Sequence, residues 1–266
     1  MKNVVFVAAH KACPVPDDPL YLPVFVGSTG KDDIGFQRDD EGENISSLNY
    51  RYCELTGLYW CWKHVQCDNL GLVHYRRYFS LHPRKTKSGF LNAVLTSDEA
   101  ESLLREYRVI LPRKRHYYIE TIYSHYDHTF YGDQLDAARD AIKKTCPEYL
   151  ESFDAFMNSR SGYMFNMAIM RRELFDDYCT WLFALLPHIE ERIDDSQYTA
   201  FHKRYIGRVS ERLFNVWLMQ KIKQRIIKKE EIREIPYIYD GSVNWPKKIS
   251  SFLMAKLFGK KYEKSF

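Results

Sequence analysis

The sequence lacks long apolar runs, and none approaches the roughly eighteen consecutive apolar residues that a membrane-spanning helix needs. The first apolar stretch, residues 4–9, ends at His10 and Lys11. Because this stretch is too short for the core of a secretion signal, we expect it to form a first β-strand in a cytoplasmic protein.

Several short motifs are also absent. No Cys-x-x-Cys pair occurs among the six cysteines, so we expect reduced, mostly buried thiols rather than disulfides or a zinc site. The chain contains no Gly-x-Gly-x-x-Gly, Gly-x-x-x-x-Gly-Lys-Ser/Thr, Gly-x-Ser-x-Gly or His-Glu-x-x-His motif. These absences argue against a Rossmann dehydrogenase, a P-loop NTPase, a serine hydrolase and a zinc protease.

The chain has no net positive charge outside its last twenty residues. The net charge is +4, but the last twenty residues hold six lysines and one glutamate, which leaves the remainder at −1. A nearly neutral body argues against a nucleic-acid-binding groove across the fold. We therefore expect no nucleic-acid partner.

The basic end, residues 246–266, has the pattern of an amphipathic helix. Ile249, Phe252, Leu253 and Leu257 share one helical face that lysines surround. Such a helix lies in a membrane interface and is attracted to anionic lipid by about 1 kcal/mol per lysine. We expect either this peripheral attachment to the inner face of the cell membrane or a helix docked on the body with solvated lysines.

Residues 1–245 alternate between short apolar runs and helical patterns, which is typical of a single α/β domain. The runs at residues 4–8 and 70–75 suit strands that are covered on both faces. The pattern predicts one mixed sheet flanked by helices. Further strands are expected at residues 21–26, 108–111, 162–170 and 232–239, and helices at residues 49–66, 97–107, 132–145, 147–158, 172–192 (with a break at Pro187) and 210–223.

Polar residues follow two of the predicted strands. His10 and Lys11 come after the first strand, and the run His74, Tyr75, Arg76, Arg77 closes the strand at residues 70–75. Ligands of open α/β sheets bind outside the carboxyl ends of the strands, and paired guanidinium groups suit phosphate oxygens. The alternative is that neighbouring side chains of an extended segment point to opposite faces, which leaves one arginine merely solvated.

The predicted helix at residues 49–66 contains a glycine, at a cost of up to about 1 kcal/mol. A first turn that faces a ligand would explain Glu54 and Thr56, with close approach of the ligand at Gly57. Tyr59 belongs to the same segment, although its helical spacing also suits a core position.

Other polar residues lie in apolar or aromatic surroundings. His125, Asp127 and His128 lack a third partner at metal-ligand spacing, so we interpret their segment as a loop that contacts ligand hydroxyl groups. Asn166 lies in an apolar predicted strand and needs partners for its amide, either ligand hydroxyls or the backbone of a neighbouring strand. Ser210 either caps the last helix or belongs to a carboxylate site with Glu211.

Five segments together resemble a bacterial family of glycosyltransferases that build capsular polysaccharide and exopolysaccharide, a family long known only as a domain of unknown function. The resemblance spans roughly residues 3–240, and its most specific part is the block HYRRYF at residues 74–79. The segments are His10-Lys11, residues 54–64, 71–79, 163–183 and 210–218.

The resemblance implies a GT-A-like fold and transfer of a sugar to a lipid-linked capsular or O-antigen polysaccharide. Characterised relatives are similar to inverting galactofuranosyltransferases that use UDP-galactofuranose without a metal. They lack the metal-binding Asp-x-Asp motif, which is absent here too. We therefore expect a UDP-sugar donor, a polyprenyl-diphosphate-linked oligosaccharide acceptor, and no divalent metal or other cofactor.

Protein cations would then neutralise the departing diphosphate in place of a metal. The alternatives are a non-enzymatic peripheral membrane adaptor and a nucleotide-sugar hydrolase. The candidate donor-binding residues are His10, Lys11, Thr56, Tyr59, His74, Tyr75, Arg76, Arg77 and Arg212; the candidate acceptor-binding residues are His125, His128 and Asn166; and the catalytic base is expected among Glu211, Asp195 and Asp127.

Overall fold

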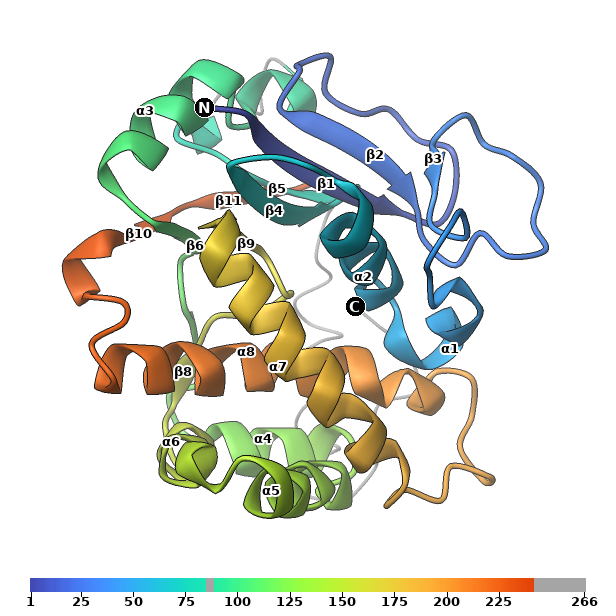
Figure 1. Ribbon diagram of the computed structural model, residues 1–266, viewed down its shortest axis with the longest axis vertical. Helices are drawn as coiled ribbons and strands as arrows, with labels where there is room; N and C mark the ends of the chain where they lie inside the picture. The colour runs from blue at the N-terminus through green and yellow to red at the C-terminus, as the bar shows by residue number, and fades with distance from the viewer. Residues whose placement is uncertain (85–88, 242–266) are drawn as a thin grey trace.

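The computed structural model describes residues 1–84 and 89–241. The predicted basic helix at residues 246–266 lies outside the described residues. The predicted mixed sheet flanked by helices is confirmed, and it forms a single domain (Figure 1). Among the described residues, no helix is long and apolar enough to cross a bilayer.

The central sheet has the strand order β10-β6-β9-β4-β1-β2-β3, and β5 pairs with both β4 and β11 beside this path. A separate ribbon of two strands, β7 and β8, extends from it. The strands are β1 (Asn3–Ala9), β2 (Tyr21–Phe25), β3 (Gln37–Arg38), β4 (Asn69–His74), β5 (Arg77–Phe79), β6 (Val109–Pro112), β7 (Arg115–His116), β8 (Ser161–Gly162), β9 (Ala168–Arg171), β10 (Ile232–Ile235) and β11 (Tyr237–Tyr239).

Pairing direction decides which segments meet. Strand β1 runs parallel to β4, with Ala8 opposite His74, whereas β9 runs antiparallel to both β4 and β6. The carboxyl ends of β1, β4 and β6 and the start of β9 therefore share one edge of the sheet. We call this edge the carboxyl-terminal rim, and the edge where β1 and β4 begin the amino-terminal rim.

Alternation along the strands divides the core into two layers. Phe6 of β1 packs with the helices α2, α7 and α8 on one face, while its neighbour Val5 packs with α3 on the other. Helices α4–α6 pack beneath α7 and α8 (Figure 1). The helices are α1 (Asn49–Tyr52), α2 (Leu55–His64), α3 (Ser97–Glu106), α4 (Ile122–Thr129), α5 (Asp133–Thr145), α6 (Leu150–Met157), α7 (Arg172–Glu190) and α8 (Tyr205–Lys223).

The prediction of one helix over residues 49–66 is wrong, because the chain breaks at Cys53 between α1 and α2. Cys53 has φ 53° and ψ −128°, outside the helical region. Its carbonyl accepts hydrogen bonds from Asn49 Nδ2 (2.7 Å) and Thr56 Oγ1 (3.1 Å), which offset the lost helical bonds. Gly57 also has a different role from the one expected: a Cβ there would lie 2.7 Å from Val26 Cγ1, so the glycine lets α2 pack closely on the sheet.

The prediction of one strand over residues 162–170 is also wrong. After β8 the chain turns through Phe165 (φ 75°) and Asn166 (φ 54°) before β9 begins. The turn is required because β9 enters the sheet from the carboxyl-terminal rim. Asn166 therefore lies in a left-handed turn at that rim, a conformation that asparagine tolerates better than most residues.

Four smaller expectations also fail. His125, Asp127 and His128 lie in α4 rather than in a loop, because Thr121 caps that helix. Ser210 lies inside α8, which begins at Tyr205, and is not its cap. Helix α7 continues through Pro187 to Glu190. Residues 232–239 form two strands, β10 and β11, which pair with β6 and β5 respectively.

Candidate functional site

Cationic side chains from separate segments converge on the carboxyl-terminal rim. His10 and Lys11 follow β1, Arg76 lies in the turn between β4 and β5, and Arg204 directly precedes α8. Burial lowers the pKa of His10 below 6.5, and repulsion by Lys11, Arg204, Lys31 and Arg76 lowers it further. The structure thus confirms that the two predicted strand ends meet.

Tyr75 contacts three of these basic side chains, those of His10, Lys11 and Arg76. The ring centroids of Tyr75 and His10 are 5.2 Å apart, edge to face. Lys11 Nζ lies 5.8 Å and Arg76 Cζ 5.7 Å from the Tyr75 centroid. These are cation–π distances, at which the charge stays intact. Within residues 1–84 and 89–241, none of His10, Lys11, Arg76 and Arg204 has a carboxylate partner.

Two residues of the HYRR run act within the fold. His74 Nε2 lies 2.6 Å from the carbonyl oxygen of Phe165. The Arg77 guanidinium lies 4.5 Å from the Phe165 centroid and 5.0 Å from that of Tyr239. His74 and Arg77 therefore fasten the β4–β5 hairpin to the turn before β9 and to β11, while Arg76 is exposed.

One carboxylate, that of Glu54, lies close to these cations at the start of α2. Asn166 Nδ2 donates to Glu54 Oε1 (2.8 Å) and also approaches Ser210 Oγ (3.0 Å) and the carbonyl of Gly207 (3.2 Å). Glu54 is also within electrostatic range of Arg204. The buried amide of Asn166 is thus satisfied by Glu54 and α8 rather than by a neighbouring strand.

Backbone strain is concentrated around Glu54. Cys53 directly precedes Glu54 and has a positive φ. Asn166, which donates to Glu54, and its neighbour Phe165 also have positive φ. Such conformations cost about 1–3 kcal/mol each and persist where the surrounding structure fixes them, commonly at functional sites. The sequence pattern singled out Glu54 as a residue of a helical turn that faces a ligand, but Glu54 was not among the predicted catalytic bases.

Arginines recur every four residues on α8 and just before it, which places Arg204, Arg208 and Arg212 on one helical face. Arg208 Cζ lies 4.4 Å from the ring centroids of both Phe130 and Phe201, and burial lowers its pKa. Arg212, predicted to bind the donor, is buried and donates to Glu211 Oε2 (2.7 Å).

The three bases predicted from the sequence, Glu211, Asp195 and Asp127, all have partners within the fold. Glu211 forms the ion pair with Arg212. Asp195 accepts two hydrogen bonds from Arg51, at 2.7 Å and 2.9 Å, and so ties α1 to the segment after α7. Asp127 accepts a hydrogen bond from the Gly132 backbone amide (3.1 Å).

Thr56 and Tyr59 form contacts within the fold. The buried Thr56 hydroxyl bonds within the break at Cys53. The Tyr59 hydroxyl donates to Glu43 (2.6 Å), and its ring packs edge to face on Phe183 of α7 (5.0 Å). Their contacts position α2.

The predicted acceptor-binding histidines of α4 come together around a buried carboxylate. His128 Nδ1 lies 2.7 Å and His125 Nδ1 3.1 Å from the oxygens of Glu120. Burial lowers the pKa of His125 to about 4, so this imidazole is neutral at pH 7. No group of three or more His, Cys, Asp or Glu side chains in the described part of the chain is suited to hold a metal ion.

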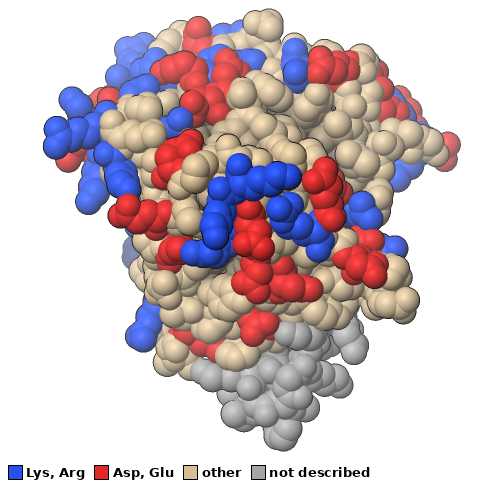
Figure 2. Space-filling model, turned by 60° about the horizontal axis from the view of Figure 1, so that its bottom comes forward, with Lys and Arg blue, Asp and Glu red and all other residues tan. Residues whose placement is uncertain are grey.

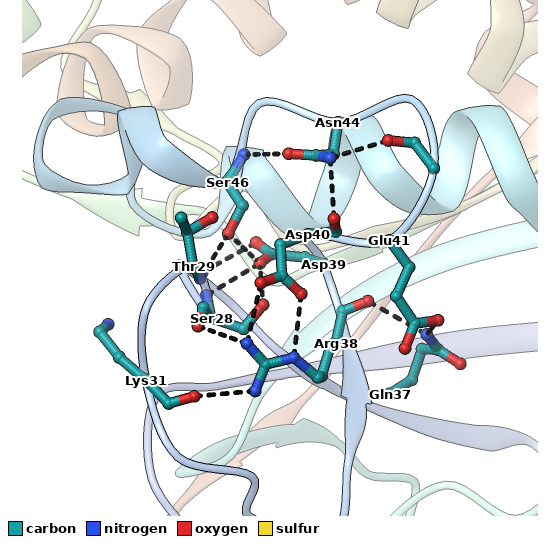
Figure 3. A network of polar contacts seen from close by, with 12 residues as sticks. Ser28, Thr29, Lys31, Gln37, Arg38, Asp39, Asp40, Glu41, Asn44 and Ser46 are labelled. Atoms are coloured by element: carbon teal, nitrogen blue, oxygen red, sulfur yellow. Dashed lines mark hydrogen bonds and ion pairs between the residues drawn. The ribbon is translucent and has the colours of Figure 1, made fainter.

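The loop after β2 borders the rim and is held by a polar network (Figure 3). Buried Asp39 accepts hydrogen bonds from the backbone amide and hydroxyl of Ser28 (3.0 Å and 2.9 Å) and from the Ser46 hydroxyl. Arg38 donates to the carbonyls of Ser28 (2.7 Å) and Lys31 (3.0 Å). The network therefore fixes the loop that brings Lys31 toward His10.

Elsewhere the surface charges are interspersed. On the face that α4–α6 present, acidic and basic side chains lie side by side (Figure 2), as in the ion pair between Arg139 and Asp154 (2.7 Å). An open depression of about 600 Å³ lies at the amino-terminal rim, where Arg108 pairs with Glu173 (3.2 Å) and Glu231 (3.4 Å). At the carboxyl-terminal rim, by contrast, several basic side chains from separate segments lie near one another.

Comparison with known proteins concerns the family and the fold of the chain. A family model described as "Domain of unknown function (DUF4422)" matches residues 4–223. Among solved structures, the chain is similar to the apo structure of the bifunctional glycosyltransferase WbbM, with a TM-score of 0.83 and 27% sequence identity. The match covers 91% of this chain but only 46% of that one, so the chain spans less than half of its length. No curated protein matches. The fold is accordingly GT-A-like.

Proposed function

The chain belongs to the family described as a domain of unknown function (DUF4422), and from this premise we propose that it is a glycosyltransferase that uses a nucleotide-sugar donor. The observation that carries the proposal is the group of rim cations without carboxylate partners beside a single oriented carboxylate. The likeness to WbbM, a bifunctional glycosyltransferase, supports it.

We assign the donor diphosphate to His10, Lys11, Arg76 and Arg204. Burial lowers the pKa of His10, and repulsion by the neighbouring cations lowers it further; an anion between them would relieve that repulsion. A departing nucleoside diphosphate gains negative charge in the transition state, which fixed cations stabilise. This assignment requires no divalent metal, as the family resemblance also suggests.

Glu54 is our candidate for the catalytic base. Asn166 fixes Oε1 of the carboxylate, and none of the described residues hydrogen-bonds to Oε2. In the proposed step Glu54 takes the proton of the acceptor hydroxyl while the hydroxyl oxygen attacks the anomeric carbon. The bond from that carbon to the diphosphate oxygen breaks on the opposite face, UDP leaves with the electron pair, and the configuration inverts.

The finer identity of the substrates rests on the sequence resemblance. We propose UDP-galactofuranose as the donor and a polyprenyl-diphosphate-linked capsular or O-antigen oligosaccharide as the acceptor. Such an acceptor lies at the inner face of the cell membrane, where the protein would act as a peripheral enzyme. The predicted basic helix at residues 246–266, which would support this location, lies outside the described residues.

Nucleotide binding provides the first test. UDP at 100 times its Kd should stabilise the protein by about 2.7 kcal/mol, whereas uridine, which lacks the diphosphate, should stabilise it far less. Thermal unfolding with each ligand measures the difference. An unchanged Tm with UDP would overturn the proposal and favour the adaptor.

Product analysis provides the second test. A panel of UDP-galactofuranose, UDP-galactopyranose and UDP-glucose is incubated with and without an oligosaccharide acceptor. Acceptor-dependent release of UDP, together with an extended oligosaccharide, supports transfer. An equal rate of UDP release without acceptor identifies a hydrolase.

A further inference from the structure

A second surface, with different chemistry, leaves the same rim. After β6 ends at Pro112, exposed Arg113 and Lys114 lead into the β7–β8 ribbon. Beyond β7 lie Tyr118 and Ile119, which are 78% and 67% exposed. Together they are a pair of adjacent large apolar side chains that extend into solvent.

The backbone holds this pair outward. Tyr118 has φ 54°, a left-handed conformation that is strained for an aromatic residue. Arg160 Nη1 donates to the carbonyl of Tyr118 (3.2 Å), and the Tyr117 amide donates to the carbonyl of Arg160 (2.9 Å). Hydrogen bonds to Arg160 thus hold Tyr118 in an exposed conformation, although its ring gains no stability from burial.

The charged side chains within the segment that carries the pair have one sign. Arg113, Lys114 and Arg160 are exposed, and residues 113–119 contain no Asp or Glu. The next acidic residue, Glu120, is buried and bound to the α4 histidines. We call residues 113–119 together with Arg160 the basic-aromatic tip.

We propose that the basic-aromatic tip docks on the surface of an anionic phospholipid bilayer. Tyrosine is enriched at the membrane interface, where its ring meets the acyl boundary and its hydroxyl meets water. Each nearby Lys or Arg adds attraction to anionic headgroups. A projecting tip with two apolar side chains is too small for a stable protein interface, which buries roughly 800 Å² per partner.

Docking in this way has a consequence for orientation. The tip continues from β6 at the carboxyl-terminal rim, so a membrane that it touches lies on the side of the sheet where β1 and β4 also end. The proposal does not depend on the glycosyltransferase activity, because lipid binding is measured without any sugar donor.

Vesicle co-sedimentation of the full chain tests the proposal. We expect binding to vesicles of phosphatidylglycerol and phosphatidylcholine, and much weaker binding to phosphatidylcholine alone. Replacing Tyr118→Asn together with Ile119→Ser should lower the partition coefficient at least about tenfold; asparagine is chosen because it tolerates positive φ. Replacing Arg113→Gln together with Lys114→Gln should lower it about fivefold per charge at low salt.

Ile226→Ser is the matched control, because Ile226 is also exposed (45%) but follows α8 and precedes β10, which begins at the amino-terminal rim. This variant should bind as the unmodified chain does, and the melting temperatures of all variants should agree. Undiminished binding by the Tyr118/Ile119 variant, or no binding by the unmodified chain, overturns the proposal. A dimer that the same variant converts to a monomer would instead identify the tip as an interface between copies and also overturn it.

Discussion

The arginines compared at the two rims of the sheet differ in their hydrogen-bond partners. At the amino-terminal rim, Arg108 pairs with Glu173 and Glu231, and Arg172 pairs with Asp176 (2.8 Å). At the carboxyl-terminal rim, Arg76 and Arg204 have no carboxylate partner among the described residues. Arg76 instead donates to the Tyr239 hydroxyl (2.7 Å), and Arg204 Nε donates to Cys53 Sγ (3.2 Å).

We interpret the ion-paired arginines as contributing to stability and the arginines without an ion pair as available to bind an anionic ligand. A paired arginine contributes modestly to folding and offers little to an incoming anion. A group of unpaired cations destabilises the free protein by mutual repulsion, and an anionic ligand that relieves the repulsion binds more tightly in return. We therefore interpret the depression at the amino-terminal rim as structural.

The largest expected effect comes from removing the Glu54 carboxylate at the carboxyl-terminal rim, with a carboxylate of the amino-terminal rim as the control. Glu54→Gln should lower the rate of acceptor-dependent UDP release about a thousandfold, because it removes the proposed base. The affinity for UDP should stay within a fewfold of that of the unmodified chain. Glu173→Gln, at the opposite rim, should leave the rate unchanged; if both variants retain full activity, Glu54 is not the base.

The next largest effect comes from replacing arginines. At the carboxyl-terminal rim we expect weaker UDP binding, and at the amino-terminal rim lower stability. Arg76→Gln and Arg204→Gln should each weaken UDP binding about tenfold or more, since each removes a hydrogen bond to a charged group. Arg108→Gln should leave UDP affinity unchanged but lower stability by about 0.5–1 kcal/mol. Calorimetric titration and thermal unfolding measure the two quantities, and equal loss of UDP affinity in all three variants would erase the distinction between the rims.

A smaller effect concerns pH. Burial, and after it the neighbouring cations, hold the pKa of His10 below its ordinary value in the free protein, which favours the neutral imidazole. A bound diphosphate favours the imidazolium, so binding takes up a proton and UDP affinity should rise by up to about tenfold between pH 8 and pH 6. Titration in buffers of different ionisation enthalpy detects the proton. His10→Gln should flatten the dependence, and a slope retained in this variant would assign the proton to another group.

The smallest expected effect is none at all. Since protein cations are proposed to neutralise the leaving group, EDTA should leave the rate of UDP release unchanged, and added Mn²⁺ or Mg²⁺ should not raise it. A strict requirement for either ion would show that the rim cations do not suffice.

The sequence predicted the features that follow from local pattern. The apolar runs of β1 and β4 have the pattern of buried strands, and their parallel pairing brings His10 and Tyr75 together without further information. The cysteines are free thiols, of which Cys53, Cys61 and Cys179 are buried. These outcomes depend only on burial and on the geometry of parallel sheets.

What could not be predicted depends on tertiary contacts. Residues 49–66 have helical composition, and side-chain hydrogen bonds from Asn49 and Thr56 to the Cys53 carbonyl help to stabilise the break that places Glu54 at a helix start. Asn166 has the sequence context of a strand, and its left-handed turn arises from the reversed direction of β9. Arg204 offers no signal in the sequence beyond a charge near a helix.

The reversed strand β9 also affects how the protein is made. It pairs Leu70 with Met170, a hundred positions apart, and the proposed site draws on positions 10, 54, 76, 166 and 204. Contacts between such distant positions form late in folding, because a long loop must close first. A chain still emerging from the ribosome therefore lacks a complete form of the proposed site, which is assembled only after the segment around position 204 has been made.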